Sequence, residues 1–258
     1  MKAADRRQSP WGPELPPAQW RELLAEGARR LGLTLEEAAG RRLELYFHEL
    51  LKWHRRVNLV ARAPEPELLE THFLDSLTLL PLLDSPATEA PAASQPLAGD
   101  EPPASMTSSL SLLDIGSGAG FPGLVLKCCH PELALTMVEP RQKRVAFLRQ
   151  VIRQTGLGAA SEVVTGRLEP GGGLLADRCW PLITSRALAS VADFLALCAP
   201  LSPPGGRVIC MKGRRAAEEI EQWHRGDLAD QYRLQEERRL QLPFSGDARC
   251  LLIFEKKQ

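Results

Sequence analysis

A glycine-rich segment that follows an apolar run carries the clearest chemical signal in this 258-residue chain. The apolar run Leu110 to Ile115 leads directly into Gly116, Gly118 and Gly120. Glycine suits such a position because the chain can turn tightly there while a ligand lies against a backbone that carries no Cβ. Pro122 can begin the next helix, since the first helical turn has no N–H bond to lose. We therefore predict a strand, a ligand-binding turn and a helix from Gly120.

A carboxylate at the end of the next apolar run supplies the second half of this signal. Glu139 closes the segment Leu133 to Val138. It follows Gly116 by about 20 residues, the separation at which a carboxylate at the tip of the second strand accepts hydrogen bonds from ribose hydroxyls. The glycines alone could simply make a tight turn, but together with Glu139 they predict a nucleoside ligand.

The glycine spacing distinguishes between two kinds of nucleoside cofactor. Dinucleotides are held by G-x-G-x-x-G turns, in which a helix N-terminus lies close to the pyrophosphate. The segment Gly116 to Gly120 reads G-x-G-x-G instead. S-adenosylmethionine has an amino-acid end and no phosphate, so this spacing favours a methyl donor over a nicotinamide cofactor.

The elements that must position this turn change character along the chain. Apolar residues at helical spacing predict an N-terminal helical extension over residues 1–83, and residues 84–109 form a Pro/Ala/Ser-rich loop. From residue 110 to 258, strands and helices alternate, which predicts an α/β domain with a mostly parallel, seven-stranded sheet. Further strands are expected at 162–165, 182–184 and 207–211, helices at 143–155, 191–198 and 216–224, and a closing hairpin at 232–242 and 249–254.

Composition excludes several other classes of protein. Lys plus Arg and Asp plus Glu both number 32, so any nucleic-acid binding must depend on a local basic patch. The six cysteines show no C-x-x-C spacing, and we expect neither a metal site nor a disulfide framework. No apolar run is long enough to cross a bilayer, so we expect a cytoplasmic protein.

The glycine segment also resembles the motif of a known family. The run Leu113 to Gly123 is similar to the motif of the bacterial small-subunit rRNA guanine-N7 methyltransferases, also called glucose-inhibited division protein B. Further segments that resemble this family, in the same order, are Asn58-Leu59, His72 to Leu77, Lys143 to Arg149, Thr184 to Ala187, Met211 to Gly213 and Leu240 to Pro243. The resemblance implies a Rossmann-like class I methyltransferase domain preceded by helices. It also implies methyl transfer from S-adenosylmethionine to N7 of a guanine in 16S rRNA.

The resemblance places the donor site at the ends of four expected strands. The residues it implies, together with the other two glycines of the turn, are Gly116, Gly118, Gly120, Phe121, Glu139, Pro140, Arg141, Leu168, Glu169 and Arg186. Ligands of open α/β sheets bind at the carboxyl ends of the strands, which agrees with these positions. Two departures stand out: Glu139 replaces the Asp of many relatives, and the 84–109 segment is longer than expected for the family.

The chemistry of the implied reaction limits which catalytic groups are needed. Guanine N7 carries a lone pair and no proton, so it can attack the sulfonium methyl without a general base. The protein must align the reactants and stabilise the moving charge. We therefore expect no metal and no Ser-His-Asp machinery, with Arg186 as the one catalytic candidate and a structural ion pair as its alternative role.

Cations and polar residues near the expected strand ends are candidates for binding RNA. They are Asn58, His72, Lys143, Arg144, Arg167, Lys212, Arg214 and Arg215. Phosphate contacts would account for the cations, although a solvated surface or a helix cap explains such residues too. The partner expected on this basis is 16S rRNA or the small ribosomal subunit, bound by a monomer. The alternatives are a class I methyltransferase with a small-molecule or protein acceptor, and a non-catalytic nucleotide-binding module.

Overall fold

Seven strands form one sheet in the computed structural model, which describes residues 14–83, 110–171, 173–186 and 189–258. The strands are β1 (Ser111–Ile115), β2 (Ala134–Glu139), β3 (Ser161–Thr165), β4 (Leu182–Arg186), β5 (Arg207–Lys212), β6 (Tyr232–Gln241) and β7 (Ala248–Lys256). Their order across the sheet is β3-β2-β1-β4-β5-β7-β6. Strands β1 to β5 are parallel, and β7 is antiparallel to both β5 and β6. The predicted mostly parallel sheet and its closing hairpin are confirmed.

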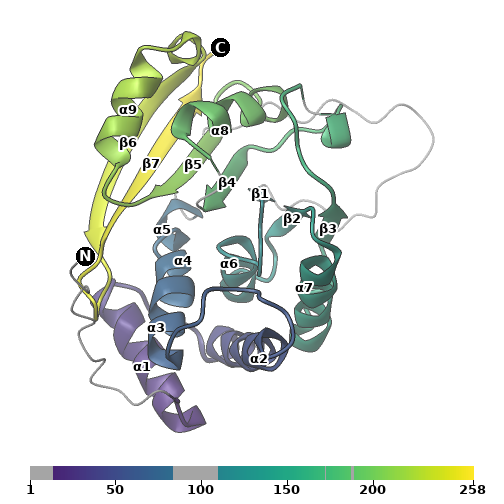
Figure 1. Ribbon diagram of the computed structural model, residues 1–258, viewed down its shortest axis with the longest axis vertical. Helices are drawn as coiled ribbons and strands as arrows, with labels where there is room; N and C mark the ends of the chain where they lie inside the picture. Colours follow the sequence, from purple (N-terminus) through teal and green to yellow (C-terminus); the bar gives the residue numbers. More distant parts are fainter. Residues whose placement is uncertain (1–13, 84–109, 172, 187–188) are drawn as a thin grey trace, which may run out of the picture.

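Helices cover both faces of this sheet (Figure 1). The helices before the sheet are α1 (Pro17–Arg30), α2 (Glu37–His54), α3 (Glu65–Leu68), the π-helix η1 (Leu69–Leu74), α4 (Asp75–Leu77) and α5 (Leu80–Leu83). Those between the strands are α6 (Gly123–Cys129), α7 (Gln142–Thr155), α8 (Val191–Cys198) and α9 (Ala216–His224), with the short 3-10 turns η2 (Gly173–Leu175), η3 (Ala199–Leu201) and η4 (Asp227–Ala229). None of the helices in the described residues is long and apolar enough to cross a membrane.

Alternation along the buried strands divides the core into two clusters. In β1, Leu112 packs with α6 and α7, whereas Leu113 and Ile115 pack with α8 and α9. Successive side chains of a strand point to opposite faces, so every position of β1 selects one of the two clusters. Asp114 consequently faces the side of α6, where its carboxylate meets the start of that helix.

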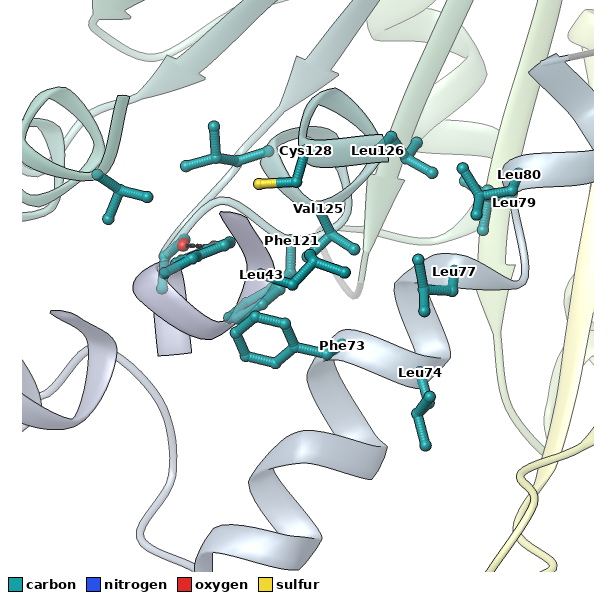
Figure 2. Packing of buried hydrophobic residues seen from close by; sticks show 14 of the residues in the cluster. Leu43, Phe73, Leu74, Leu77, Leu79, Leu80, Phe121, Val125, Leu126 and Cys128 are labelled. Atoms are coloured by element: carbon teal, nitrogen blue, oxygen red, sulfur yellow. Dashed lines mark hydrogen bonds between the residues drawn. The ribbon is translucent and has the colours of Figure 1, made fainter. Parts of the chain in front are cut away.

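The N-terminal helices share the first of these clusters. Trp20 of α1, Phe47 of α2 and Phe73 of η1 pack in the same cluster as Leu124 of α6 and Phe147 of α7. Figure 2 shows side chains from both parts of the chain in close packing, with Leu43, Phe73 and Leu77 near Phe121, Val125 and Leu126. The helical extension therefore packs as an outer layer on α6 and α7. The Pro/Ala/Ser-rich loop at 84–109 lies outside the described residues.

Helix α1 approaches η1 closely at Gly27, and this contact gives a stability prediction. A Cβ at Gly27 would lie 2.3 Å from a methyl group of Leu74, which is fully buried. We expect Gly27→Ala to lower the free energy of unfolding by about 1–3 kcal/mol, because overpacking outweighs the better helix propensity of alanine. The matched control is Gly40→Ala in α2, where nothing lies within 4 Å.

Gly40→Ala is expected to raise the free energy of unfolding by about 0.5–1 kcal/mol. Urea unfolding of both variants provides the comparison. Equal effects of the two substitutions would show that α1 does not approach η1 as described.

The strand order changes direction between β1 and β4. From β1 the chain proceeds outward through β2 and β3, and it then returns to place β4 on the other side of β1. At such a switch point the two adjacent connections leave the sheet in opposite directions, and ligands of open α/β sheets bind at this place. The glycine segment follows β1 and Arg186 is the last residue of β4, so both lie at this switch point.

Candidate active site

The glycine segment makes a turn that only glycine adopts without strain. Gly116, Gly118 and Gly120 have φ values of +72°, +59° and +96°. Helix α6 consequently begins at Gly123, and the expectation that it begins at Gly120 is wrong, because a residue with positive φ cannot belong to a right-handed helix. At Gly120 a Cβ would also lie 2.6 Å from the hydroxyl of Tyr46.

Glu139 fastens this turn to the second strand. Its Oε2 accepts the backbone N–H of Gly118 at 3.0 Å and its Oε1 accepts that of Arg141 at 2.9 Å. The Arg144 guanidinium is 3.9 Å from Oε2, and the Glu139 side chain is 2% exposed. Each carboxylate oxygen has about two acceptor positions, so one on each oxygen remains for a hydroxyl group. The free acceptor positions of Glu139 therefore fit the hydroxyl groups of a ribose beside the glycine turn.

Asp114, a motif residue to which the sequence analysis gave no role, supports the turn from below. Its side chain is fully buried, and Oδ2 accepts the N–H of Gly123 at 3.1 Å. Oδ1 has no hydrogen-bond partner among the described residues. Burial raises the pKa of Asp114 to about 7, although the bond from Gly123 opposes that rise. The carboxyl group of Asp114 therefore keeps its proton at pH values where an ordinary aspartate has already lost it.

The raised pKa of Asp114 makes stability dependent on pH. Between 3.8, the ordinary value, and about 7, the folded protein keeps a proton that the unfolded chain releases. The free energy of unfolding contributed by this group therefore falls as the pH rises from about 4 to about 7, by up to about 1.4 kcal/mol per pH unit, and is level above that.

The test is urea unfolding of Asp114→Asn and the wild type at about pH 5 and about pH 8. The variant keeps an acceptor for Gly123 and has no titrating proton at this position. As the pH rises, the wild type should therefore lose free energy of unfolding relative to the variant. Comparing them cancels His72, whose lowered pKa acts in the opposite direction. A difference that is constant with pH would contradict the buried, protonated carboxyl group.

Arg186 lies at the centre of a polar cluster that joins the sheet to the helical extension. Its Nη1 donates to the carbonyl of Thr71 at 2.6 Å and lies 3.5 Å from Asp75 Oδ2. Its Nη2 donates to His72 Nδ1. Asp75 is also 3.2 Å from the guanidinium of Arg249 on β7. The alternative role considered for Arg186, a structural ion pair, is therefore present in the structure.

His72 is held in one neutral form by this cluster. Arginine can only donate, so Nδ1 of His72 accepts and its ring proton is on Nε2. Burial and the charge of Arg186 lower the pKa of His72 to about 3, so the ring does not become charged near neutral pH. It stacks on Phe121 with ring centroids 4.8 Å apart. His72 therefore contributes a neutral ring at the edge of the glycine turn.

The aromatic ring that follows the glycine turn is buried beneath it. Phe121 is 5% exposed and packs against Phe73, with ring centroids 5.3 Å apart (Figure 2). It also stacks on Tyr46, with ring centroids 5.5 Å apart. Tyr46 donates from its hydroxyl to the carbonyl of Ala119 in the turn. Tyr46 was not predicted as a site residue, because its only signal in the sequence was its place beside the apolar face of α2. The ring of Phe121 anchors the turn to the helical extension.

The other donor-site candidates surround the same strand ends. Pro140 and Arg141 are exposed after β2, and Glu169 is exposed after β3. Leu168 is 6% exposed and packs in the second core cluster, so little of its side chain can reach a ligand.

The RNA-binding candidates divide into exposed and engaged side chains. Lys143, Arg167, Arg214, Arg215 and Asn58 are exposed. Lys212 is different, because its ammonium group donates to the carbonyl of Ala189 at 2.6 Å and pairs with Glu219 at 2.8 Å. The Lys212 side chain is 10% exposed, so it is engaged within the protein, and its contact with RNA stays a prediction. The described residues contain no cluster of three or more His, Cys, Asp or Glu that could hold a metal ion.

Comparison with known proteins identifies the family to which this arrangement belongs. The family model described as "rRNA small subunit methyltransferase G" matches residues 103–246. The chain belongs to this family. The predicted family, a methyltransferase fold and S-adenosylmethionine as the methyl donor are thereby confirmed.

Individual relatives agree with this assignment over nearly their whole length. The ribosomal RNA small subunit methyltransferase G of Desulfotalea psychrophila is 38% identical over 89% of this chain and 95% of its own. The protein with the same description from Myxococcus xanthus is 34% identical over 93% of this chain and 99% of its own.

Among solved structures, TrmN from Thermus thermophilus superposes with a TM-score of 0.48 and 17% identity, covering 76% of this chain and 55% of that one.

Proposed function

We propose that this chain transfers the methyl group of S-adenosylmethionine to N7 of a guanine in 16S rRNA. The description of its relatives as small subunit rRNA methyltransferases supports an acceptor in that RNA. The observation that carries the proposed site is the position of Glu139, whose buried carboxylate holds Gly118 across the ends of β1 and β2. This position is where a ribose would be recognised beside a turn without side chains.

Each group of residues has a separate task in this proposal. Gly116, Gly118 and Gly120 offer a backbone surface to the methyl donor, and Glu139 accepts from its ribose. Pro140, Arg141 and the segment Leu168-Glu169 border the space for the adenine. When bound, S-adenosylmethionine supplies an electrophilic methyl group on its sulfonium centre. Arg186 and His72 border the acceptor side of the turn, where they fix the orientation of the base.

The protonation states of these residues suit a reaction without a general base. His72 is neutral and, with a pKa of about 3, is a poor proton acceptor. Asp114 is buried beneath the turn and contacts Gly123. Guanine N7 has no proton to remove, so alignment of its lone pair is the main requirement for transfer. The electrostatics of the site need only favour charge as it moves onto the purine.

The exposed cations at the same edge of the sheet favour an RNA acceptor over a small metabolite. Lys143, Arg167, Arg214 and Arg215 are exposed and lie in segments that follow β2, β3 and β5. Neutralising phosphates requires several such side chains, but it does not require the whole protein to carry a positive charge. These contacts could be made with naked 16S rRNA, with an assembling particle or with the finished small subunit. We also predict that the protein acts as a monomer in the cytoplasm.

The experiment that tests this proposal is transfer of tritiated methyl groups to RNA from a strain that lacks the activity. Naked 16S rRNA and small subunits are offered separately, and N7-methylguanosine is located by strand cleavage at the modified base. We expect label at the N7 of a guanine in 16S rRNA. Label on another atom, or on another RNA, would contradict the acceptor while leaving the methyl donor in place.

A further inference from the structure

A groove of about 400 Å³ lies at the end of β5, outside the residues that the proposed donor site uses. One side is formed by the chain that leaves β5, at Gly213, Arg214 and Ala217. The other side is formed by the β6–β7 hairpin, at Arg239, Ala248 and Arg249. The groove therefore separates the first turn of α9 from the tip half of the hairpin.

Unequal strand lengths explain why this groove exists. Strand β5 ends at Lys212, which is paired with Cys250 of β7. Strand β7 begins before that point, and Ala248 and Arg249 pair only with Gln241 and Leu240 of β6. The edge of β7 that faces β5 is therefore left uncovered at Ala248 and Arg249. Small residues at Gly213, Ala217 and Ala248 keep the space beside that edge open.

The charged side chains of the groove are mostly arginines. Three arginines and one glutamate, Glu237, line it. Arg239 pairs with Glu237 at 2.7 Å, and Arg249 pairs with Asp75 at 3.2 Å. Arg214 is exposed and has no ion pair with any residue that the structure describes. The groove thus has one unpaired guanidinium and another, Arg239, whose partner is itself partly exposed.

Ion pairs connect the groove to the methyl-transfer site. Arg249, which lines the groove, contacts Asp75, and Asp75 contacts Arg186 at 3.5 Å. The Arg186 guanidinium lies 5.6 Å from the centre of the Phe121 ring, directly after the glycine turn. Because β5 and β1 are parallel members of one sheet, the groove and the turn both lie at the carboxyl edge of that sheet. A strand of RNA that reached the turn could continue into the groove.

We propose that this groove binds the ribose-phosphate backbone of an unpaired nucleotide that flanks the methylated guanine. The inference rests on the proposed function, because it assumes an RNA acceptor. A volume of about 400 Å³ falls in the range of pockets that hold one small ligand, and it is too small for a duplex. Guanidinium groups bind phosphate with two parallel hydrogen bonds, which suits Arg214 and Arg239. Proteins that recognise RNA by sequence mostly bind single-stranded loops, whose nucleotides are accessible one at a time.

The test compares the groove arginines with nearby arginines that lie outside the groove. Arg214→Gln and Arg239→Gln are made beside Arg225→Gln at the end of α9 and Arg233→Gln at the far end of β6, both exposed and in surface ion pairs. Filter binding of 16S rRNA is measured over a range of salt concentrations. Each groove variant should raise Kd about tenfold and reduce the slope of log K against log salt by about 0.7. The controls should match the wild type, and calorimetric titration should show unchanged affinity for S-adenosylmethionine in all four.

A third substitution separates phosphate binding from structural damage. Glu237→Gln removes the one negative charge of the groove and releases Arg239. It should lower Kd for 16S rRNA severalfold, an effect that a damaged fold would not produce. If Arg214→Gln and Arg239→Gln bind RNA like their controls, or if Glu237→Gln does not tighten binding, the groove is not a nucleotide site. A wild-type protein that transfers no methyl group to 16S rRNA would instead overturn the proposed function.

Discussion

Replacement of Glu139 by alanine is expected to raise the Kd for S-adenosylmethionine at least ~100-fold. The variant loses the acceptors for two ribose hydroxyls, and hydrogen bonds to a charged group are each worth about 1.5–3 kcal/mol. It also leaves the N–H groups of Gly118 and Arg141 without their partner. The turn then loses its attachment to β2, so the binding surface is less well ordered before the ligand arrives. Calorimetric titration measures the change.

Two further substitutions of acidic residues serve as controls for this prediction. Glu139→Asp keeps the charge with a shorter reach and should stay within about tenfold of the wild type. Glu162→Ala removes an exposed carboxylate from the neighbouring strand β3, where it pairs with Arg178. This variant should bind S-adenosylmethionine with the Kd of the wild type. A folded Glu139→Ala protein with wild-type affinity would show that the ribose is bound elsewhere.

Replacement of Arg186 by methionine is expected to lower the free energy of unfolding by about 3 kcal/mol and to reduce kcat/KM at least ~10-fold. Removing one member of a buried ion pair typically costs about 3–5 kcal/mol because its partner is left buried and charged. Arg249 still accompanies Asp75, which places the expected loss near the lower limit. Activity falls because His72 and the carbonyl of Thr71 lose the donor that fixes them at the edge of the turn.

Variants of the same cluster distinguish positioning from simple loss of stability. Arg186→Lys keeps the positive charge but lacks the planar guanidinium group. Compared with Arg186→Met, it should restore more of the free energy of unfolding than of kcat/KM. The double variant with Asp75→Asn should be less destabilised than the sum of the two single changes, since the two side chains interact directly. Urea unfolding and methyl-transfer kinetics supply both quantities. Arg178→Met, which removes an exposed cation over Trp180, is the control and should cost less than about 1 kcal/mol.

The parts of the site that were predictable from the sequence have local causes. Positive φ at Gly118 and Gly120 follows from what a tight turn requires of the backbone, and those glycines could be read from their spacing. The position of Glu139 at the end of β2 followed from the apolar run before it. Periodicity likewise predicted the strands and helices to within a few residues. Each of these features depends on neighbours in the sequence.

The parts that were not predictable depend on distant contacts. Asp75 lies between Arg186 at the end of β4 and Arg249 on β7, and all three residues are far apart in the sequence. Pairing of this kind is visible only once the strand order is known. Lys212 was assigned to RNA because its spacing suggested a strand end, whereas its partner Glu219 on α9 neutralises it. Phe121 was named for the donor site from the family motif, and its packing against Tyr46 of α2 could not be predicted from the sequence.

The most direct test of the account is a crystal structure of this protein with S-adenosylhomocysteine, the product that keeps the ribose and lacks the transferred methyl. We expect both ribose hydroxyls within hydrogen-bond distance of the Glu139 carboxylate and the amino-acid end against Gly116 to Gly120. A nucleoside located away from the carboxyl ends of β1 and β4, or bound without contact to Glu139, would contradict the account.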